Sequence, residues 1–196
     1  MSTTAYPEKA IVWGDVETTG LKGHQEQLLE VAFLVTDLDL NLLDETGYQA
    51  AVYLGNTTDV AEVRAGAVPF VQQMHDNSGL WGACADPSRS KPLAVVEAEV
   101  LAYIRRFVPE PKTARLGGNS VRLDLNFLDE HTPLVSEHLL YRMLDVSTIT
   151  GVAQWRMGLE PFEKQRNHTA MADIRESIAE LKYLFASGAF PRPVAA

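Results

Sequence analysis

The sequence predicts one α/β domain in which helices flank a mixed sheet of five strands. Two observations lead to this fold class. Runs rich in branched apolar residues occupy the first quarter of the chain and predict a meander of three strands. Helical periods and short strand-like segments then alternate along the rest of the chain, which is typical of helices packed on a sheet. A length of 196 residues suits one domain with a full core.

The strands come mainly early in the chain. Residues 10–15 are the predicted first strand and residues 28–38 the second. Residues 39–41 are a candidate turn, so residues 42–54 form a third strand antiparallel to the second. The polar stretches at residues 55–66 and 86–91 predict loops. Two further strands are expected later, at residues 113–117 and 139–146.

The helices are recognised from apolar residues that recur every three or four positions. A short helix is expected at residues 69–77, and longer ones at 93–108 and 121–131. Asp145 or Ser147 could cap another helix that runs to about Met157. The clearest helix is the last, which ends at Gly188 and whose apolar stripe leaves two acids off it. The stripe consists of Ile174, Ile178, Leu181 and Phe185, and the two acids are Glu176 and Glu180.

Composition suggests how the chain is divided into segments and which classes of protein it argues against. We expect a loose arm at residues 1–9, one domain at 10–188 and a tail at 189–196. No apolar run approaches the ~20 residues of a membrane helix, and no signal peptide is visible. The single cysteine, Cys84, fits a reducing, cytoplasmic location. A net charge of −9 argues against coating long nucleic acid, although a short nucleic-acid substrate remains compatible.

The first strand ends in two acids, Asp15 and Glu17. Residues i and i+2 of a strand point to the same face, so these carboxylates would lie side by side and repel each other. Such a pair is stable if a cation lies between them or if one acid is protonated. Hard divalent ions take oxygen ligands of this kind. A strand end with two solvated acids is the alternative.

Two further acidic positions and a histidine are candidates for the same site. Asp124 lies on a helix that starts where the fourth predicted strand ends, although it could equally be an exposed helical acid. His168 and Asp173 are five residues apart, which is about 140° on a regular helix. They therefore do not share a face, and we expect His168 in the loop before the helix and Asp173 in its first turns.

Together these residues have the parts needed to hydrolyse a phosphodiester. Four carboxylates from three segments suit a pair of divalent ions about 3.5–4 Å apart. A histidine with a pKa of about 6.5 can accept a proton from the attacking water near neutral pH. This reading needs no organic cofactor. The four acids are Asp15, Glu17, Asp124 and Asp173, and the histidine is His168.

Five segments of the chain resemble, in order, the DEDDh class of 3′-to-5′ exonucleases, and more specifically oligoribonuclease. They are residues 13–21, 75–80, 118–128, 141–148 and 168–181. The resemblance implies an RNase H-like fold with a five-stranded sheet, a homodimer, and two Mg²⁺ or Mn²⁺ ions. It implies cleavage of very short RNA oligonucleotides, down to dinucleotides, into 5′-mononucleotides. By position it makes the four acids metal ligands and His168 the general base.

The resemblance also implies substrate-binding positions. Ser120, Arg142, Ser147 and Thr148 match a pocket for the 5′ phosphate, in which Arg142 could form paired hydrogen bonds. A closed 5′ end would restrict substrate length. A surface ion pair for Arg142 and helix caps for the two hydroxyl residues of 147–148 are the alternatives.

Four more positions match residues that contact the bases or complete the site. Leu21 matches a residue that wedges against the bases, and Tyr141 matches an aromatic residue that reaches the partner subunit's site. His75 matches a histidine among the substrate-binding positions. Leu21 and Tyr141 could instead be ordinary core or interface residues. Phe70 stands where the family usually has a tryptophan, and Thr18 where it has methionine. Phenylalanine keeps a π face but offers less stacking area.

Two other functions are compatible with parts of this pattern. A general DEDDh exonuclease that acts on DNA or longer RNA, as in proofreading or RNase T-like trimming, would share the catalytic set but would not need the string around Arg142. A non-catalytic binding module on this fold would usually lack one or more metal ligands, whereas all five catalytic positions are filled here.

Overall fold

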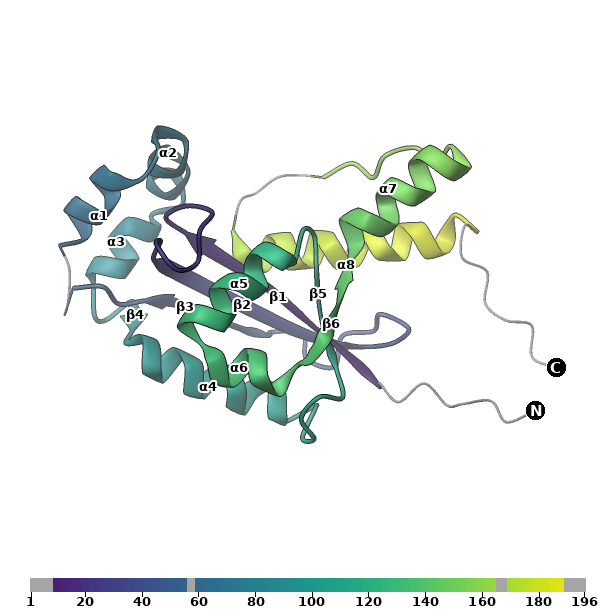
Figure 1. Cartoon of the computed structure of the whole chain (residues 1–196), viewed down its shortest axis with the longest axis horizontal. Coiled ribbons are helices and arrows are strands. Elements are labelled where there is room, and N and C mark those ends of the chain that lie inside the picture. The colour runs from purple at the N-terminus through teal and green to yellow at the C-terminus, as the bar shows by residue number, and fades with distance from the viewer. Residues whose placement is uncertain (1–8, 56–58, 165–168, 189–196) are drawn as a thin grey trace.

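The computed structural model describes residues 9–55, 59–164 and 169–188. Its centre is one mixed sheet with strand order β4-β3-β2-β1-β5-β6 (Figure 1). β2 is antiparallel to both of its neighbours, whereas β1, β5 and β6 run parallel, as do β3 and β4. The strands are β1 (Ala10–Thr18), β2 (Leu28–Asp37), β3 (Tyr48–Val52), β4 (Ser90–Lys91), β5 (Arg115–Gly118) and β6 (Leu140–Asp145).

The sheet confirms the predicted mixed α/β class but has six strands instead of five. The additional strand, β4, consists of Ser90 and Lys91 and lies within residues predicted as loop. Two residues are too few to give a period-2 pattern. The third strand is also shorter than predicted, because residue 42 forms only an isolated bridge to Thr36.

The described residues form eight helices, which include all of those predicted from the sequence. Three were not predicted: α1, α3 and α6. α1 lies in a stretch predicted as loop. None of its residues is fully buried, and only Val60 and Val63 pack partly buried against the core, which is too short a pattern to indicate a helix. α3 and α6 have six residues each, too few for a clear repeat. The helices are α1 (Val60–Gly66), α2 (Pro69–Ser78), α3 (Leu80–Ala85), α4 (Leu93–Arg105), α5 (Arg122–His131), α6 (Pro133–His138), α7 (Val146–Met157) and α8 (Ala170–Ala186).

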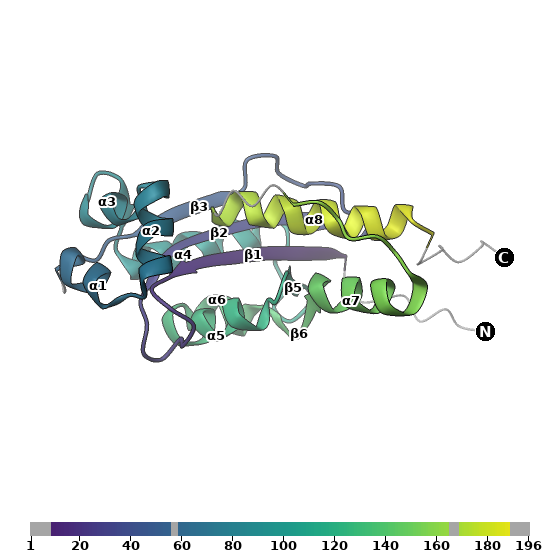
Figure 2. The ribbon, with the colours of Figure 1, turned by 90° about the horizontal axis from the view of Figure 1, so that it is seen from above.

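Alternate residues of β1 belong to two cores on opposite faces of the sheet. Val12 packs with the core under α4 and α5, whereas Ile11 and Trp13 pack with α7 and α8. Figure 2 shows α8 in front of β2 and α4 behind the strands, so these two helices cover opposite faces of the sheet. β1 therefore presents Asp15 and Glu17, which continue the odd-numbered positions, to the face that α8 covers.

Gly14 allows the strand to pack closely beside the acids. A Cβ atom at this position would lie 2.8 Å from side-chain atoms of both Leu116 and Phe33. Any larger residue would have to move this core, so the residue before Asp15 is fixed by packing on the opposite face.

The last helix confirms the strongest sequence pattern, with two changes. Ile174, Ile178 and Leu181 are buried as predicted. Leu184 replaces Phe185 in the buried stripe, since Phe185 is exposed. Glu180, predicted off the stripe, is buried as well.

Some predictions fall partly outside the described residues. The arm at 1–9 and the tail at 189–196 do so almost entirely, and the division of the chain at these boundaries stays a prediction. Within the described ranges, no helix has the length and apolar character needed to cross a membrane.

Candidate metal centre

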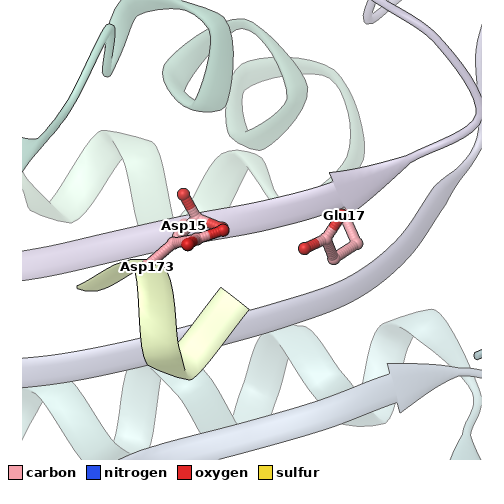
Figure 3. A group of neighbouring side chains, drawn as sticks. All are labelled: Asp15, Glu17 and Asp173. Atoms are coloured by element: carbon pink, nitrogen blue, oxygen red, sulfur yellow. The ribbon is translucent and has the colours of Figure 1, made fainter. Parts of the chain in front are cut away.

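Three carboxylates meet where β1 passes the start of α8. Asp15 and Glu17 come from the strand and Asp173 from the first turn of the helix. One oxygen atom of each lies within 4.8 Å of those of the other two. Figure 3 shows Asp15 and Asp173 close together, with Glu17 further along the strand. The sequence pattern and the fold therefore bring together segments that are more than 150 residues apart in the chain.

Asp124 joins this group from the other edge of β1. β5 pairs with β1 only as far as Trp13, so the N–H of Val16 is left for another acceptor. The Asp124 side chain accepts that hydrogen bond through Oδ1, at 3.1 Å. It lies in the first turn of α5 and is buried, which excludes the alternative of an exposed helical acid.

Burial and repulsion make three of these acids, Asp15, Glu17 and Asp124, hard to ionise without a cation. Burial, and then repulsion from Asp124, Glu17 and Asp173, raises the pKa of Asp15 well above its ordinary value. Burial and neighbouring acids raise the pKa of Glu17 to about 8. The same causes raise the pKa of Asp124 to about 7, although its backbone hydrogen bonds oppose the shift.

This donor set fits a hard divalent cation. All of its atoms are carboxylate oxygens, the ligands that Mg²⁺ and Mn²⁺ prefer. A bound cation would favour the charged carboxylates that repulsion otherwise disfavours. The structure thus provides an acidic cluster able to hold metal, on side chains whose positions are set by regular elements.

Glu30 is a fifth acid that the sequence did not identify. It lies opposite Glu17 in the register of β1 and β2. Its carboxylate has hydrogen bonds with the Gln49 side chain and the backbone of Ala170, at the start of α8, which lower its pKa, but burial is the larger effect and raises it. One signal could have revealed it, because Glu30 is the only acid among residues 28–36.

His168 lies outside the described residues. The helix starts at Ala170, after Thr169, so Asp173 occupies its first turn as predicted.

Three of the four predicted phosphate-binding positions lie together around Asp145. The Ser120 N–H donates to Asp145 Oδ1 at 3.2 Å and to Ser147 Oγ at 3.3 Å. Ser147 Oγ donates to the same Asp145 oxygen at 2.5 Å, and the Thr148 N–H at 3.4 Å. Asp145 therefore caps α7, one of the two caps that the sequence suggested.

Arg142, the fourth position, lies on the exposed strand β6. Its Nε donates to the Tyr141 hydroxyl at 2.9 Å, and its guanidinium lies 5.3 Å from the centre of the Tyr141 ring. The surface ion pair considered from the sequence is not the contact seen for this side chain.

The predicted base-contacting residues are exposed, which is unusual for large apolar side chains. Leu21 is 75% exposed, Phe70 70% and Tyr141 72%. None of them is a core residue, so the alternative of a core role for Leu21 and Tyr141 is wrong. Exposed apolar groups of this kind are available for stacking on a ligand or a partner.

His75, in contrast, is buried. Its Nε2 lies 3.0 Å from the carbonyl oxygen of Thr18 and therefore carries the proton, and its ring packs edge-on against Trp81. Its Nδ1 has no hydrogen-bond partner among the described residues. In this structure His75 supports the backbone that follows Glu17.

Comparison with known proteins agrees with this fold and identifies the family. The family model for exonucleases, RNase T, matches residues 12–181. Escherichia coli exonuclease I in complex with a dA16 oligonucleotide superposes with a TM-score of 0.63 at 14% identity and covers 91% of this chain. The chain spans only 41% of that protein. The fold and the acidic site therefore define an exonuclease.

Relatives of similar length refine this class. The oligoribonuclease of Nocardia farcinica is 41% identical over 181 residues, which are 90% of this chain and 79% of the relative. That of Streptomyces coelicolor is 42% identical over 187 residues, 93% of this chain and 88% of the relative. The chain belongs to the oligoribonuclease family.

Proposed function

We propose that this protein is a 3′-to-5′ exoribonuclease that hydrolyses very short oligoribonucleotides, dinucleotides above all, to 5′-mononucleotides. The observation that carries the proposal is the convergence of Asp15, Glu17 and Asp173 within 4.8 Å, beside Asp124, in a chain of the oligoribonuclease family. Four neighbouring carboxylates, two of them buried and two half-buried, have a clear use in binding cations and little use otherwise.

The four acids would hold two divalent cations, Mg²⁺ or Mn²⁺. Such ions, when bound, supply an activated water and stabilise charge on the reacting phosphate. The acids contribute by fixing the ion positions before substrate arrives, because β1, α5 and α8 are anchored in the two cores. His168, near the start of α8, would accept the proton of the attacking water.

Selectivity for short substrates would come from the cluster of Ser120, Ser147 and Thr148 at the start of α7. Hydroxyl groups there can donate to the 5′ phosphate, and Arg142 would add paired, charge-assisted hydrogen bonds after leaving Tyr141. A 5′ end enclosed in this way leaves no path for a longer strand.

Leu21 and Phe70 would contact the bases, and their exposure supports this role. Stacking of a base on an aromatic ring contributes about 1–3 kcal/mol. His75 would act from beneath the site, through the backbone at Thr18, where the family pattern has methionine.

We also propose a homodimer in which Tyr141 completes the partner's site. β6 is an edge strand, and it exposes Tyr141 beside α7, whose Trp155 is 78% exposed. An uncovered edge with large aromatic groups favours an interface. The lone, buried thiol of Cys84 supports a cytoplasmic location.

The test is turnover of a 5′-phosphorylated diribonucleotide with Mg²⁺, measured beside a heptaribonucleotide and a single-stranded DNA heptamer. Strong preference for the dinucleotide is expected. Equal or faster cleavage of either heptamer would contradict the closed 5′ pocket and favour the alternative, a general exonuclease. No turnover of any substrate despite metal binding would indicate a non-catalytic module.

A further inference from the structure

A further buried acid, Glu180, lies outside the metal centre. Its side chain is on α8 and the residue is only 4% exposed. It accepts hydrogen bonds from Lys164 Nζ at 2.7 Å, Thr150 Oγ1 at 2.7 Å and Asn119 Nδ2 at 3.0 Å. A buried carboxylate is costly unless it is paired. Here the partners come from three separate segments, so Glu180 joins them to α8.

Asn119 links the same helix to the metal centre. Its Nδ2 also donates to Ser177 Oγ at 2.9 Å. Ser177 Oγ in turn donates to the backbone carbonyl of Asp173, again at 2.9 Å. Asn119 is therefore tied at two points to the helix that carries a candidate metal ligand.

The next residue, Ser120, begins the proposed 5′-phosphate pocket. Its φ is +52°, in the left-handed region that residues other than glycine rarely adopt. Such a conformation persists only when the surroundings hold it. Asn119 holds this segment to α8 on one side, and the Ser120 N–H holds it to Asp145 and Ser147 on the other.

We propose that Glu180 and Asn119 are positioning residues that fix the separation between the metal centre and the 5′-phosphate pocket. This inference rests on the proposed function. A dinucleotide bound at both ends reacts only if the pocket presents its single phosphodiester to the metal centre in register. A misplacement of about 1 Å at a reacting group can cost about a hundredfold in rate. The Glu180–Asn119 bond thus sets the length of substrate that fits.

A purely structural role makes a different prediction. If Glu180 only stabilised α8, its loss would displace Asp173 and lower turnover of every substrate alike. A positioning role lowers turnover only where the 5′ phosphate is used. The comparison needs a substrate that reports on the metal centre alone, and the p-nitrophenyl ester of thymidine 5′-monophosphate, which has no second nucleotide, serves this purpose.

Two variants and one control test the proposal. Glu180→Leu keeps a similar side-chain volume but has no acceptor atom, which breaks the hydrogen bond from Asn119. Asn119→Ala removes the other partner and remains informative if Glu180→Leu does not fold. Glu130→Leu makes the same substitution at an exposed position of α5.

The readout is kcat and KM for the diribonucleotide with and without its 5′ phosphate, and for the ester. Both variants should reduce the advantage given by the 5′ phosphate about tenfold, mainly in kcat, and leave the ester nearly unchanged. The double variant should lose little more of the 5′-phosphate advantage than either single variant, because both substitutions break the same hydrogen bond between Asn119 and Glu180. The control should match the unsubstituted protein.

Two results would overturn the inference: an unchanged 5′-phosphate advantage in both variants, or equal losses on all three substrates. If the unsubstituted protein gains nothing from a 5′ phosphate, the pocket of the proposed function itself fails, and this is seen without any variant.

Discussion

The carboxylate of Asp124 accepts a hydrogen bond from the backbone N–H of Val16, the residue between Asp15 and Glu17. α5 is thereby attached to β1 at the point where the strand presents its acids. The bond orients Asp124 but occupies only one of the lone pairs of its carboxylate, so the side chain can still serve a metal ion. Asp124 has a structural and a proposed metal-binding role, and substitution can separate them.

We expect Asp124→Asn to abolish activity while the fold remains. Asparagine keeps an oxygen that can accept from Val16 but lacks the charge that binds metal. Loss of an outer-shell partner of a metal already costs about 10–100-fold, so loss of a ligand should cost at least about a hundredfold in kcat. Asp124→Ala should have a lower free energy of unfolding than Asp124→Asn, by about 1 kcal/mol, because both variants lack the charge but only alanine also loses the hydrogen bond from Val16. Steady-state kinetics and thermal unfolding of both variants check this, and an active Asp124→Asn enzyme would contradict the two-metal site.

The metal-free protein should become less stable as the pH rises from about 4.5 to about 8, the interval between the ordinary pKa of Glu17 and its raised value. In this interval the folded chain binds more protons than the unfolded chain, because Glu17 and Asp124 have raised pKa values when folded. Stability falls with pH wherever the folded state binds more protons. Each kcal/mol lost should lower the Tm by about 2–4 °C.

Metal should act in the opposite direction. Cations bind the deprotonated carboxylates, so the increase in Tm caused by Mg²⁺ should grow over the same pH interval. Calorimetric scans in chelator and in excess Mg²⁺, at several pH values, measure both trends. Glu17→Gln should flatten the pH dependence of the metal-free protein. A Tm in chelator that does not fall with pH would show that the acids are not held together as the structure has them.

Much of the site follows from local pattern. Alternation along β1 places Asp15 and Glu17 on one face, and the helix start at Ala170 puts Asp173 in a first turn. Their meeting point and the burial of Asp124 require the sheet order, which no local pattern contains. The register that sets Glu30 opposite Glu17 depends on a hairpin whose exact turn the sequence left open.

The secondary structure also divides into elements that local sequence pattern predicts and elements that it does not. Strands and helices with a buried stripe were predicted because burial leaves a period in the sequence. α1 has only two partly buried apolar residues, Val60 and Val63, and β4 has two residues in all, so neither gives a recognisable period. The prediction for Glu180 was wrong for a different reason. An acid that lies off the apolar stripe of a helix such as α8 is normally exposed to solvent. Glu180 is buried because Lys164, Thr150 and Asn119 come from distant segments to satisfy it.

Arg142→Ala should reduce turnover of a 5′-phosphorylated dinucleotide far more than that of a longer strand. In the proposed pocket the guanidinium would make charge-assisted hydrogen bonds of about 1.5–3 kcal/mol to the 5′ phosphate, so the loss should be about 10–100-fold. Arg142→Lys should recover only part of it, because lysine cannot form the planar paired contact. Arg156→Ala, an exposed arginine on α7, is the control. Equal losses on short and long substrates would remove the closed 5′ pocket.

His168→Ala should slow hydrolysis while dinucleotide binding is nearly retained. General-base catalysis contributes about 10²–10⁴-fold, and the histidine is not among the proposed metal ligands. Rapid-quench rates and equilibrium binding in Ca²⁺, measured on the same variant, separate the two effects. Weakened binding with an unchanged chemical rate would instead assign His168 to substrate positioning.

Phe70 offers the sharpest test of base stacking, because it is exposed and its substitution should leave the fold intact. Phe70→Ala should weaken dinucleotide binding by about 1–3 kcal/mol, the usual contribution of one stacked base. Phe70→Trp should strengthen it, since the larger ring covers more of the base. Val68→Ala, at a neighbouring exposed apolar residue, controls for general loss of hydrophobic surface. The Tm of all three variants should stay near that of the unsubstituted protein. If alanine and tryptophan at position 70 bind the dinucleotide equally well, then Phe70 does not stack on a base, and the exposed ring at the start of α2 must serve another contact.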